Sequence, residues 1–561
     1  MNLREKIAAA RTVGGRPFEQ LEVRFGSLGA MLEHRAGESR HATWLVYYDE
    51  DGSRVELSYG AFAELVRRTA GYLRAAGIGR GDRIATLGYN HYETVVQYFA
   101  AWWIGATVVP LNAGEDDERL HYILENSRAR LVFARADASE IFGALAATLP
   151  SLDRLVVCGG EAAGVDSFLD VVAWTHDLPE LEEGLLDAEC LIVYTSGTTG
   201  NPKGVVLAHG NLLADADGIA GWHRIDATTR MMCVLPIHHV NGTVVTLVTP
   251  MYAGGSVVLN RKFQSGTFFD RVALERVAVV SVVPTLLAFL VQADIDTSAL
   301  DLSAFRHIIC GAGPLTCELA ERFEERYRVP IVHGYGLSET TCYSCFLPVD
   351  LEREERLAWL TKHGFPSIGV PIPQNEMAIH DAQGIAVEPG ERGEIVIRGH
   401  NVMIEYYANE QANESAFTHG WFRSGDEGFH LLDDAGLPYF FITGRIKELI
   451  IRGGVNISPL EIDEVINAHP KVDAGIAVGF ENNWYGEEVG AYVRPSDSSL
   501  TEQELIEHCR AHLPGFKAPK VVIFGDEIPV TSTGKYQRNR VKSLFDAYRD
   551  VQFPTRERSK M

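Results

Sequence analysis

The chain has 561 residues, of which 46% are hydrophobic and 22% charged, a composition typical of a globular protein with more than one domain. Its 51 lysines and arginines are outnumbered by 75 acidic residues, and the net charge of −24 disfavours nucleic acids and anionic membranes as partners, because both would be repelled. Eight cysteines scattered through so long a chain do not form a disulfide framework, so we expect a reducing, cytoplasmic location.

The first part of the chain alternates short apolar segments with helical patterns. Strands are predicted at 83–88, 106–111 and 130–134, and helices at 91–103 and 115–125. Similar alternation returns between 231 and 332. It predicts right-handed β-α-β crossovers and a mainly parallel sheet, and therefore an α/β fold with one large, multi-lobed domain over 1–444.

The longest apolar stretch, 277–291, contains Ser281, Pro284 and Thr285 and is too short to cross a bilayer. We expect a buried strand followed by a helix that begins at Pro284, where a missing N–H is tolerated. The N-terminal segment is charged and lacks the apolar core of a signal peptide. The sequence thus predicts no membrane span.

The most informative segment joins an apolar strand, 191–194, to a second strand-like run that begins at Lys203. Between them lie small hydroxylated residues and glycines: Thr195, Ser196, Gly197, Thr198, Thr199 and Gly200. Backbone N–H groups and hydroxyls in such a loop can turn toward an anion, and Lys203 adds positive charge. Pro202 and the following strand exclude a Walker loop, whose lysine starts a helix. We interpret the segment as a phosphate-binding loop; the alternative is a flexible polar turn.

The C-terminal part has a different pattern, which predicts a small α+β domain over 445–561. A strand leads into the Gly453-Gly454 turn and then into a helix with Pro459 in its first position. Two capping boxes are predicted, Ser458 with Glu461 and Thr501 with Glu504. Further strands are predicted at 475–480, 488–493 and 520–524.

Five motifs follow one another in a fixed order, and together they resemble the signatures of the adenylate-forming superfamily, which comprises acyl-CoA synthetases, luciferases and peptide-synthetase adenylation domains. They are YTSGTTGNPKGV (194–205), GYGLSETT (334–341), GWFRSGDEG (420–428), GRIKELIIRGG (444–454) and PVTSTGKYQR (529–538). The resemblance covers about 40–550 and points to the acid–CoA ligase branch. It implies a large domain that binds AMP and the acid, a small mobile catalytic domain, and ATP, Mg²⁺ and CoA as ligands.

The resemblance also implies roles for single residues around the nucleotide. Tyr335 would stack on adenine, Ser338 would contact the α-phosphate, and Glu339 would hold Mg²⁺. Asp426 would take the ribose hydroxyls. His333 stands where glutamine or asparagine is frequent near adenine.

The later motifs imply a mobile catalytic domain. Arg445 would reach the ribose or a phosphate, Lys447 would be the pivot of the rotation, and Lys535 would be the catalytic lysine of adenylation. Rotation would then remove that lysine and present Gly453 and Gly454, whose bare backbone lets a pantetheine arm pass. A plain tight turn is the alternative for the two glycines.

The chemistry explains why these residue types are needed. A carboxylate becomes a good acyl donor only after it attacks the α-phosphate of ATP, which makes an acyl adenylate and expels pyrophosphate. That step brings an anion to a highly anionic substrate, so the positive charge of Lys203, Lys535 and Mg²⁺ at Glu339 must be focused on the phosphates. The thiol of CoA then takes the acyl group.

The acid site is less clear from the sequence. By position, His239 corresponds to the gate of the family's acyl tunnel, and an ordinary loop histidine is the alternative. The segment CGAGPL corresponds to a wall that lines the junction of nucleotide and acid, and the residues expected there are Gly311, Ala312, Gly313 and Gly334. Small, uncharged residues predict an apolar, roomy site, which suits an aromatic, medium-chain or polycyclic acid better than acetate.

We therefore predict an ATP-dependent carboxylic acid–CoA ligase, with primary metabolism and natural-product or antibiotic assembly both open. Three alternatives are transfer to a separate carrier protein, catalysis of one half-reaction on a supplied acyl adenylate, and a non-catalytic sensor of an acid or nucleotide. A homodimer is also left open. The Cys342-x-x-Cys345 pair lacks the second ligand pair of a zinc site, so ordinary thiols are expected.

Overall fold

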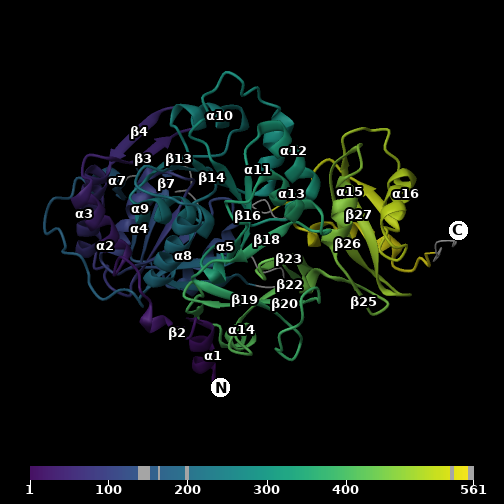
Figure 1. Ribbon diagram of the computed structural model, residues 1–561. Coiled ribbons are helices and arrows are strands. Elements are labelled where there is room, and N and C mark those ends of the chain that lie inside the picture. Colours follow the sequence, from purple (N-terminus) through teal and green to yellow (C-terminus); the bar gives the residue numbers. More distant parts are fainter. Residues whose placement is uncertain (137–148, 150–151, 162–163, 196–200, 531–535, 554–561) are drawn as a thin grey trace.

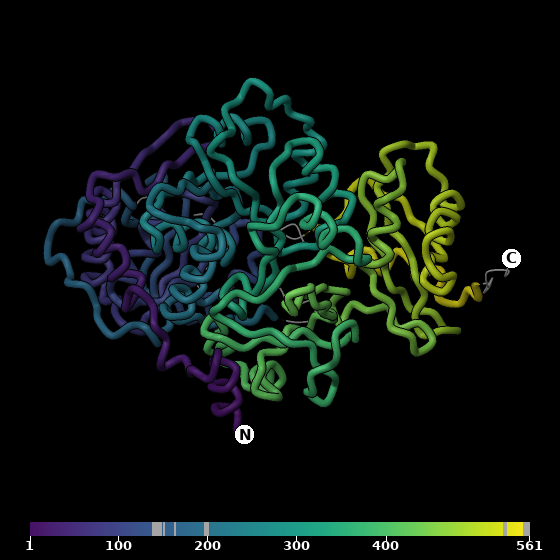
Figure 2. Tube along the Cα trace, in the orientation of Figure 1, coloured from purple at the N-terminus to yellow at the C-terminus, as the bar shows by residue number. Residues whose placement is uncertain are grey.

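The computed structural model describes residues 1–136, 149, 152–161, 164–195, 201–530 and 536–553. A large mixed α/β domain is followed by a small C-terminal domain, which stands apart at the yellow end of the chain (Figures 1 and 2). The predicted α/β fold class with a small α+β second domain is confirmed. Within the described ranges, no helix combines the length and the apolarity that crossing a membrane requires.

An eight-stranded sheet contains, near one edge, the two strands that flank the predicted phosphate-binding loop. Its order is β21 (Glu405–Tyr406), β11 (Lys203–Ala208), β10 (Glu189–Thr195), β6 (Thr107–Leu111), β5 (Arg83–Leu87), β7 (Leu131–Arg135), β8 (Arg154–Cys158) and β9 (Asp166–Ser167). The strands from β10 to β9 are parallel, whereas β11 pairs antiparallel with both of its neighbours. Thr195 pairs with Lys203 across β10 and β11, so the predicted loop does join two strands.

A second path of 13 strands positions the nucleotide motifs. Its order is β19 (Asn375–His380), β20 (Gly393–Gly399), β22 (Phe422–Leu432), β23 (Pro438–Arg445), β18 (Ser367–Pro371), β17 (Cys345–Phe346), β16 (Ile331–Tyr335), β15 (His307–Cys310), β14 (Val279–Val282), β12 (Arg230–Cys233), β13 (Ser256–Asn260), β3 (Thr43–Tyr48) and β4 (Arg54–Ser58). The run from β16 to β3 is parallel and buried, as expected of a sheet covered on both faces.

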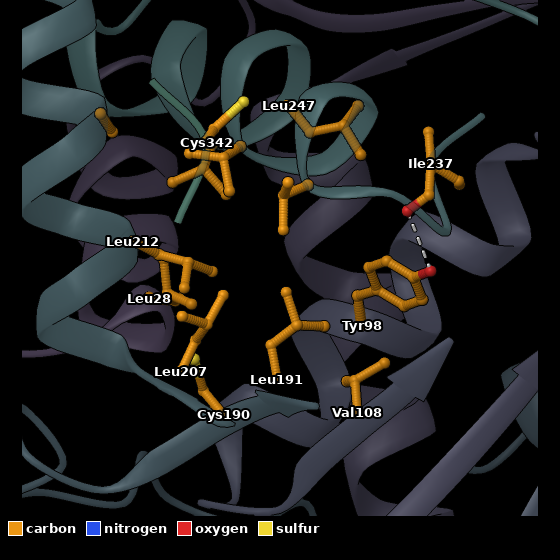
Figure 3. Close-up of a cluster of buried hydrophobic side chains, with 14 of the residues drawn as sticks. Leu28, Tyr98, Val108, Cys190, Leu191, Leu207, Leu212, Ile237, Leu247 and Cys342 are labelled. Carbon is orange, nitrogen blue, oxygen red and sulfur yellow. Dashed lines mark hydrogen bonds between the residues drawn. The ribbon is translucent and has the colours of Figure 1, made fainter. Parts of the chain in front are cut away.

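The core lies between the two sheets. Helices α4 (Tyr92–Trp103) and α8 (His209–Trp222) and the π-helix η3 (Asn241–Val248) are buried along most of their length, as helices enclosed by other layers are. Figure 3 shows side chains of these elements and of β6, β10 and β11 converging, with the Tyr98 hydroxyl donating to the Ile237 carbonyl at 3.2 Å. The predicted helix at Pro284 is confirmed by α11 (Pro284–Ala293).

The remaining helices and strands of the large domain complete its layers. They are α1 (Leu3–Ala10), β1 (Thr12–Val13), β2 (Arg16–Pro17), α2 (Leu28–Glu38), α3 (Tyr59–Ala75), α5 (Asp117–Ser127), α7 (Phe168–Val172), α9 (Thr249–Ala253), α10 (Ser265–Leu274), α12 (Cys317–Tyr327), α13 (Arg353–Thr361) and α14 (Glu410–Ala416). The predicted helix over 115–125 is thus observed two residues later, as α5, because Asp116 provides its N-cap.

The small domain has its own five-stranded sheet and core. Its elements are β24 (Ile450–Arg452), β25 (Val455–Ile457), α15 (Pro459–Asn467), β26 (Val472–Asn482), β27 (Gly486–Pro495), α16 (Glu502–His512), β28 (Val521–Phe524) and α17 (Asn539–Lys542). The boundary between 444 and 445 stays a prediction; β23 ends at Arg445 and the small sheet begins at Ile450.

The two predicted capping boxes are only half correct. Ser458 and Thr501 each accept a hydrogen bond of 3.2 Å from the N–H three residues later, so both helices are capped. The glutamates do not close the boxes because each pairs with a lysine: Glu461 with Lys517 at 2.7 Å, and Glu504 with Lys471 at 2.9 Å. Both lysines are distant in sequence, so local spacing could not predict these pairs.

Candidate active site

A cavity of about 200 Å³ lies where the large domain meets the small one. The large domain contributes Tyr335 from β16, Asp426 from β22 and Arg445 from the end of β23. The small domain contributes Tyr536 and Arg538, which follow the lysine motif. Three motifs that lie far apart in the sequence therefore share one space, together with the chain that comes directly after Lys535.

Asp426 is held from two sides. The Tyr335 hydroxyl donates to its Oδ2 at 2.5 Å, and the Arg445 Nε lies 2.8 Å from its Oδ1. Burial raises the pKa of Tyr335 well above its usual value, so the hydroxyl stays protonated and donates. A carboxylate has about four lone-pair positions, so an oriented Asp426 can still accept from two further hydroxyls.

A second cluster forms around Tyr406, a residue that the sequence analysis missed. Its ring faces Lys203, with Nζ 4.5 Å from the ring centroid, and its hydroxyl donates to Glu339 Oε1 at 2.7 Å. The antiparallel pairing of Tyr406 with Val205 sets this geometry. Tyr406 thus joins the phosphate-loop strand to the carboxylate expected to hold Mg²⁺. No motif marks it, since only the pairing of β21 with β11 brings it here.

The residues present fit a metal ion that arrives with ATP. Mg²⁺ in nucleotide sites is usually held by one or two carboxylates, phosphate oxygens and water. The carboxylate of Glu339 offers such a ligand, oriented by Tyr406. In the described part of the chain, no group of three or more His, Cys, Asp or Glu is arranged to hold a metal by itself. Cys342 and Cys345 are buried free thiols whose pKa values are raised by burial.

His333 and Gly334 form the wall of the cavity beside Tyr335. His333 Nδ1 lies 2.8 Å from the Ser367 carbonyl, which can only accept, so Nδ1 carries the hydrogen. Burial lowers the pKa of His333 to about 4, and the ring is therefore neutral with Nε2 as an acceptor. A Cβ at Gly334 would lie 2.4 Å from the Phe346 ring, so only glycine fits there.

The predicted acid wall is closely packed at Gly311. A Cβ there would lie 2.6 Å from the Tyr343 hydroxyl and 2.7 Å from the Gly334 carbonyl oxygen. Tyr343 accepts a hydrogen bond of 3.2 Å from Asn241, which in turn accepts one of 2.7 Å from Ser281. The sequence analysis missed Tyr343, Asn241 and Ser281, because ordinary polar residues on separate elements carry no local signal.

Ala312, Gly313 and His239 were also expected at the acid site. Ala312 has a φ of 62°, unusual for a residue with a side chain, and it lines the cavity with Gly313. His239 lies in the turn before η3, with its ring centroid 4.4 Å from that of His238. Burial lowers the pKa of His238 to about 4, so this neighbour of His239 is neutral.

The other predicted residues are distributed as follows. Ser338 begins the short 3₁₀ turn Ser338–Thr340 that carries Glu339. Lys447 lies in the 3₁₀ turn Ile446–Glu448; it does not line the cavity, and neither does the turn of Gly453 and Gly454. The φ angles of 57° and 84° at these glycines favour residues without a side chain. Six predicted residues lie outside the described residues: Ser196, Gly197, Thr198, Thr199, Gly200 and Lys535.

Comparisons with known proteins show the family to which the chain belongs. A family model described as AMP-binding enzyme matches residues 32–407, and one described as AMP-binding enzyme C-terminal domain matches 461–535. A feruloyl-CoA synthase from Amycolatopsis sp is 34% identical over 92% of this chain and 99% of its own. A sulfoacetate–CoA ligase from Cupriavidus necator is 32% identical over 92% and 97%. The crystal structure of ATP-bound MatB from Rhodopseudomonas palustris has a TM-score of 0.82 at 26% identity and covers 93% of this chain and 100% of its own.

Proposed function

The chain belongs to the AMP-binding enzyme family and is a ligase that joins a carboxylic acid to CoA through an acyl adenylate, and on that premise we propose which residues carry each step. ATP, the acid and CoA are its substrates, and Mg²⁺ is the usual ion for such ligases. The proposal concerns the roles of single residues, the class of acid and the place of the reaction.

We assign the nucleoside end of ATP to the cavity between the domains. Tyr335 stacks on adenine, Asp426 accepts from the ribose hydroxyls, and Arg445 holds Asp426 or reaches a phosphate. The observation that carries the proposal is the pairing of Asp426 with Tyr335 and Arg445 inside a cavity that Tyr536 also lines. His333, with Gly313 and Gly334, completes the wall, and its acceptor Nε2 suits the amino group of adenine.

The phosphate end is assigned to the cluster around Tyr406. Lys203 and Lys535 place positive charge on the triphosphate as the substrate carboxylate attacks the α-phosphate, and Ser338 hydrogen-bonds that phosphate. Thr195 and the loop through Gly200 supply further donors. Mg²⁺ held at Glu339 would neutralise phosphate charge. Tyr406 keeps Glu339 and Lys203 in fixed positions, because it contacts both.

The second step is assigned to the small domain in another orientation. Lys447 acts as the pivot, and the turn of Gly453 and Gly454 borders the path of the pantetheine arm. The support is that, in the orientation described, Tyr536 lines the cavity and the turn of Gly453 and Gly454 does not. The proposal therefore assigns the two steps to different orientations of the small domain, a form of gating by a moving domain.

For the acid we propose an aromatic carboxylic acid. Gly311 leaves a thin wall against the Tyr343 ring, and His239 stands beside a neutral histidine, so the nearby groups are uncharged and partly aromatic. A flat, uncharged acyl group matches such surroundings better than an acyl group that carries a second charge. The relative named for feruloyl-CoA supports this choice, whereas the relative named for sulfoacetate makes a short sulfonated acid the rival.

A panel assay tests the acid class. Purified protein is mixed with ATP, Mg²⁺, CoA and one of three acids: a hydroxycinnamic acid, octanoic acid or sulfoacetate. We expect AMP and a thioester with the aromatic acid at a kcat/KM at least tenfold above the other two, which is about 1.4 kcal/mol of discrimination. A preference for sulfoacetate or octanoate would contradict the proposal.

The same assay separates the remaining alternatives. Replacing CoA by a holo-carrier protein tests transfer to a carrier, and pyrophosphate exchange without CoA tests the first half-reaction alone. Turnover with CoA contradicts a sensor without catalysis.

A cytoplasmic location is part of the proposal, because all eight cysteines are free and a reducing compartment keeps them so.

A further inference from the structure

The small domain contains two buried ion pairs in which an arginine grips a carboxylate with two nitrogens. One arginine lies near the segment proposed to act in adenylation, and the other lies beside the turn proposed to act in thioester formation. Arg538 comes three residues after Lys535, and Arg452 comes directly before Gly453. Both arginines lie within motifs named in the sequence analysis, GRIKELIIRGG and PVTSTGKYQR, but neither was given a role there.

Arg538 ties the chain after Lys535 to the body of the small domain. Its Nη1 and Nη2 donate to the two oxygens of Asp463 in α15 at 3.0 and 2.5 Å, and Nη1 also donates to the Ala477 carbonyl of β26 at 2.8 Å. The Arg538 side chain is 8% exposed and that of Asp463 5%. Arg538, Asp463 and Tyr536 all line the nucleotide cavity. The Arg538–Asp463 pair thus fixes the position of the chain around Arg538 at the wall of the cavity.

The residues on either side of the undescribed part of the lysine motif are tied to each other. Val530 forms a β-bridge with Tyr536, and the Gln537 N–H donates to the Pro529 carbonyl at 2.8 Å. The described ends of the segment are therefore clamped together one residue before Arg538. A displacement of Arg538 moves both ends.

Arg452 makes the corresponding contact under the Gly453-Gly454 turn. Its Nε and Nη2 donate to the two oxygens of Glu488 in β27, both at 2.8 Å, and its guanidinium lies 3.9 Å from the Tyr485 ring centroid. The Gly453 N–H donates to the Tyr485 carbonyl at 2.8 Å. The side chains of Arg452 and Glu488 are 7% and 0% exposed. Arg452 and Tyr485 together fix the direction in which the turn leaves β24.

The Arg538–Asp463 and Arg452–Glu488 pairs have the same chemistry but lie in different parts of the small domain. A forked guanidinium–carboxylate contact fixes direction as well as distance, which a lysine ammonium does not reproduce. Buried pairs of this kind are often no more stabilising than apolar residues of the same size. We therefore infer that these two pairs serve to hold a defined geometry. Arg538 and Asp463 line the nucleotide cavity, whereas neither Arg452 nor Glu488 does.

We propose that Arg538 and Arg452 are positioning residues, one for each half-reaction: Arg538 aligns the lysine segment for adenylation, and Arg452 aligns the glycine turn for thioester formation. The inference rests on the proposed assignment of those two segments. It predicts that damage to the two pairs separates the half-reactions, although both pairs belong to one small domain.

The test compares R538K and R452K, which keep the charge and lose the fork. Adenylation is measured as pyrophosphate exchange with the acid and without CoA, and transfer as acyl-CoA formed from synthetic acyl adenylate and CoA. The ratio of the two rates in one preparation does not depend on the folded fraction. We expect R538K to lower this exchange-to-transfer ratio about tenfold to a hundredfold, and R452K to raise it by a similar factor, since a misplacement of about 1 Å can cost that much.

Matched controls isolate the geometric effect. R494K alters the half-exposed pair of Arg494 with Asp473 in the same domain and should leave the ratio within about twofold. D463N and E488Q, which weaken each grip from the carboxylate side, should reproduce the effect of the corresponding arginine variant. Thermal unfolding of every variant records the loss of stability separately.

Equal losses in both half-reactions, or an unchanged ratio in R538K and R452K, would overturn the inference and leave the two pairs as structural contacts only. A wild-type protein that transfers from acyl adenylate but never exchanges pyrophosphate contradicts the proposed function instead. In that case the R452K arm decides the inference, because transfer must then fall further in R452K than in R538K at equal thermal stability.

Discussion

The two sides of the active site are built in different ways. On the nucleotide side, ionisable and polar side chains hold one another: Tyr335 and Arg445 fix Asp426, and Tyr406 joins Lys203 to Glu339. The proposed acid side depends on the absence of a side chain at Gly311, where the Tyr343 ring packs closely against the backbone. A triphosphate demands charge at fixed points, whereas an acyl group demands only a shape.

This difference implies that changes on the two sides should have different signatures. Loss of a charged group on the nucleotide side should affect every acid equally, because all acids use the same ATP. Added volume on the acid side should divide the acids by width and leave ATP unaffected. The following changes test that division, beginning with the largest expected effect.

D426N should weaken ATP binding on the proposed nucleotide side. An amide cannot accept from both Tyr335 and Arg445 as the carboxylate does, and hydrogen bonds to charged groups contribute about 1.5–3 kcal/mol. We expect the KM for ATP to rise about tenfold to a hundredfold, by the same factor for every acid. Steady-state kinetics with two acids measures this.

Y335F is the matched control for D426N, since it removes only the hydroxyl and leaves the Arg445 pair intact. Its effect on the KM for ATP should be smaller, about fivefold. A D426N effect that differs strongly between acids would show that the two sides are coupled and would contradict the comparison.

G311A should narrow the acid side. The new Cβ would lie 2.6 Å from the Tyr343 hydroxyl, and overpacking of this kind typically costs about 1–3 kcal/mol. We expect kcat/KM to fall about tenfold for wide acids and much less for narrow ones, with the KM for ATP within about twofold of the wild-type value. Kinetics with acids of graded width measures this.

Removal of the obstructing hydroxyl provides the control. The double variant G311A/Y343F takes away the atom nearest to the added methyl group and should recover part of the activity on wide acids. The Gly334 carbonyl, 2.7 Å from the same position, prevents full recovery. Uniform losses across all acids in G311A would indicate general misfolding and not a narrowed wall.

The smallest expected effect is a difference in pH dependence between the acid side and the junction of the two domains. On the acid side His238, with a pKa of about 4, is neutral in the working range. At the domain junction, burial raises the pKa of Glu464 to about 8, with Asp463 and Glu318 adding to the rise. The Glu464 oxygens accept from the Cys317 N–H at 3.2 and 3.1 Å, so this carboxylate joins α15 of the small domain to α12 of the large one.

The sign follows from the raised pKa. Glu464 takes up a proton when the domains meet in this orientation, so its contribution is complete at low pH and is lost as pH rises through about 8. Pyrophosphate exchange should therefore fall a few-fold between pH 7 and pH 9, as estimated from such linkage. E464Q keeps an acceptor for Cys317 and does not titrate, so its profile should be flatter. A wild-type profile that rises over this range would contradict the assignment.

Much of the fold could be predicted because its signals are local. The strand at 83–88 and the helix from Pro284 follow from patterns of neighbouring residues, and both are confirmed. The glutamates of the two capping boxes were predicted wrongly, because the lysines that engage them lie far along the chain. A pattern of four residues contains no information about such partners.

The candidate site divides in the same way. Tyr335, Asp426 and Arg445 could be found because each stands in a motif, and the structure brings them together. Tyr406 and Tyr343 could not, because their contacts with Glu339 and Asn241 span 67 and 102 positions of the chain. Tyr406 and Tyr343 lie outside the five motifs, so the sequence offered no signal for the contacts that they make.

Arg445 is the last residue of β23 and stands one residue before the 3₁₀ turn that contains Lys447. The strand proposed to bind the nucleoside thus continues directly into the joint about which the small domain is proposed to turn. A torsional change at that joint would displace Arg445 and, through it, Asp426. Because such coupling is reciprocal, a nucleotide that binds more tightly in one domain orientation shifts the population toward that orientation.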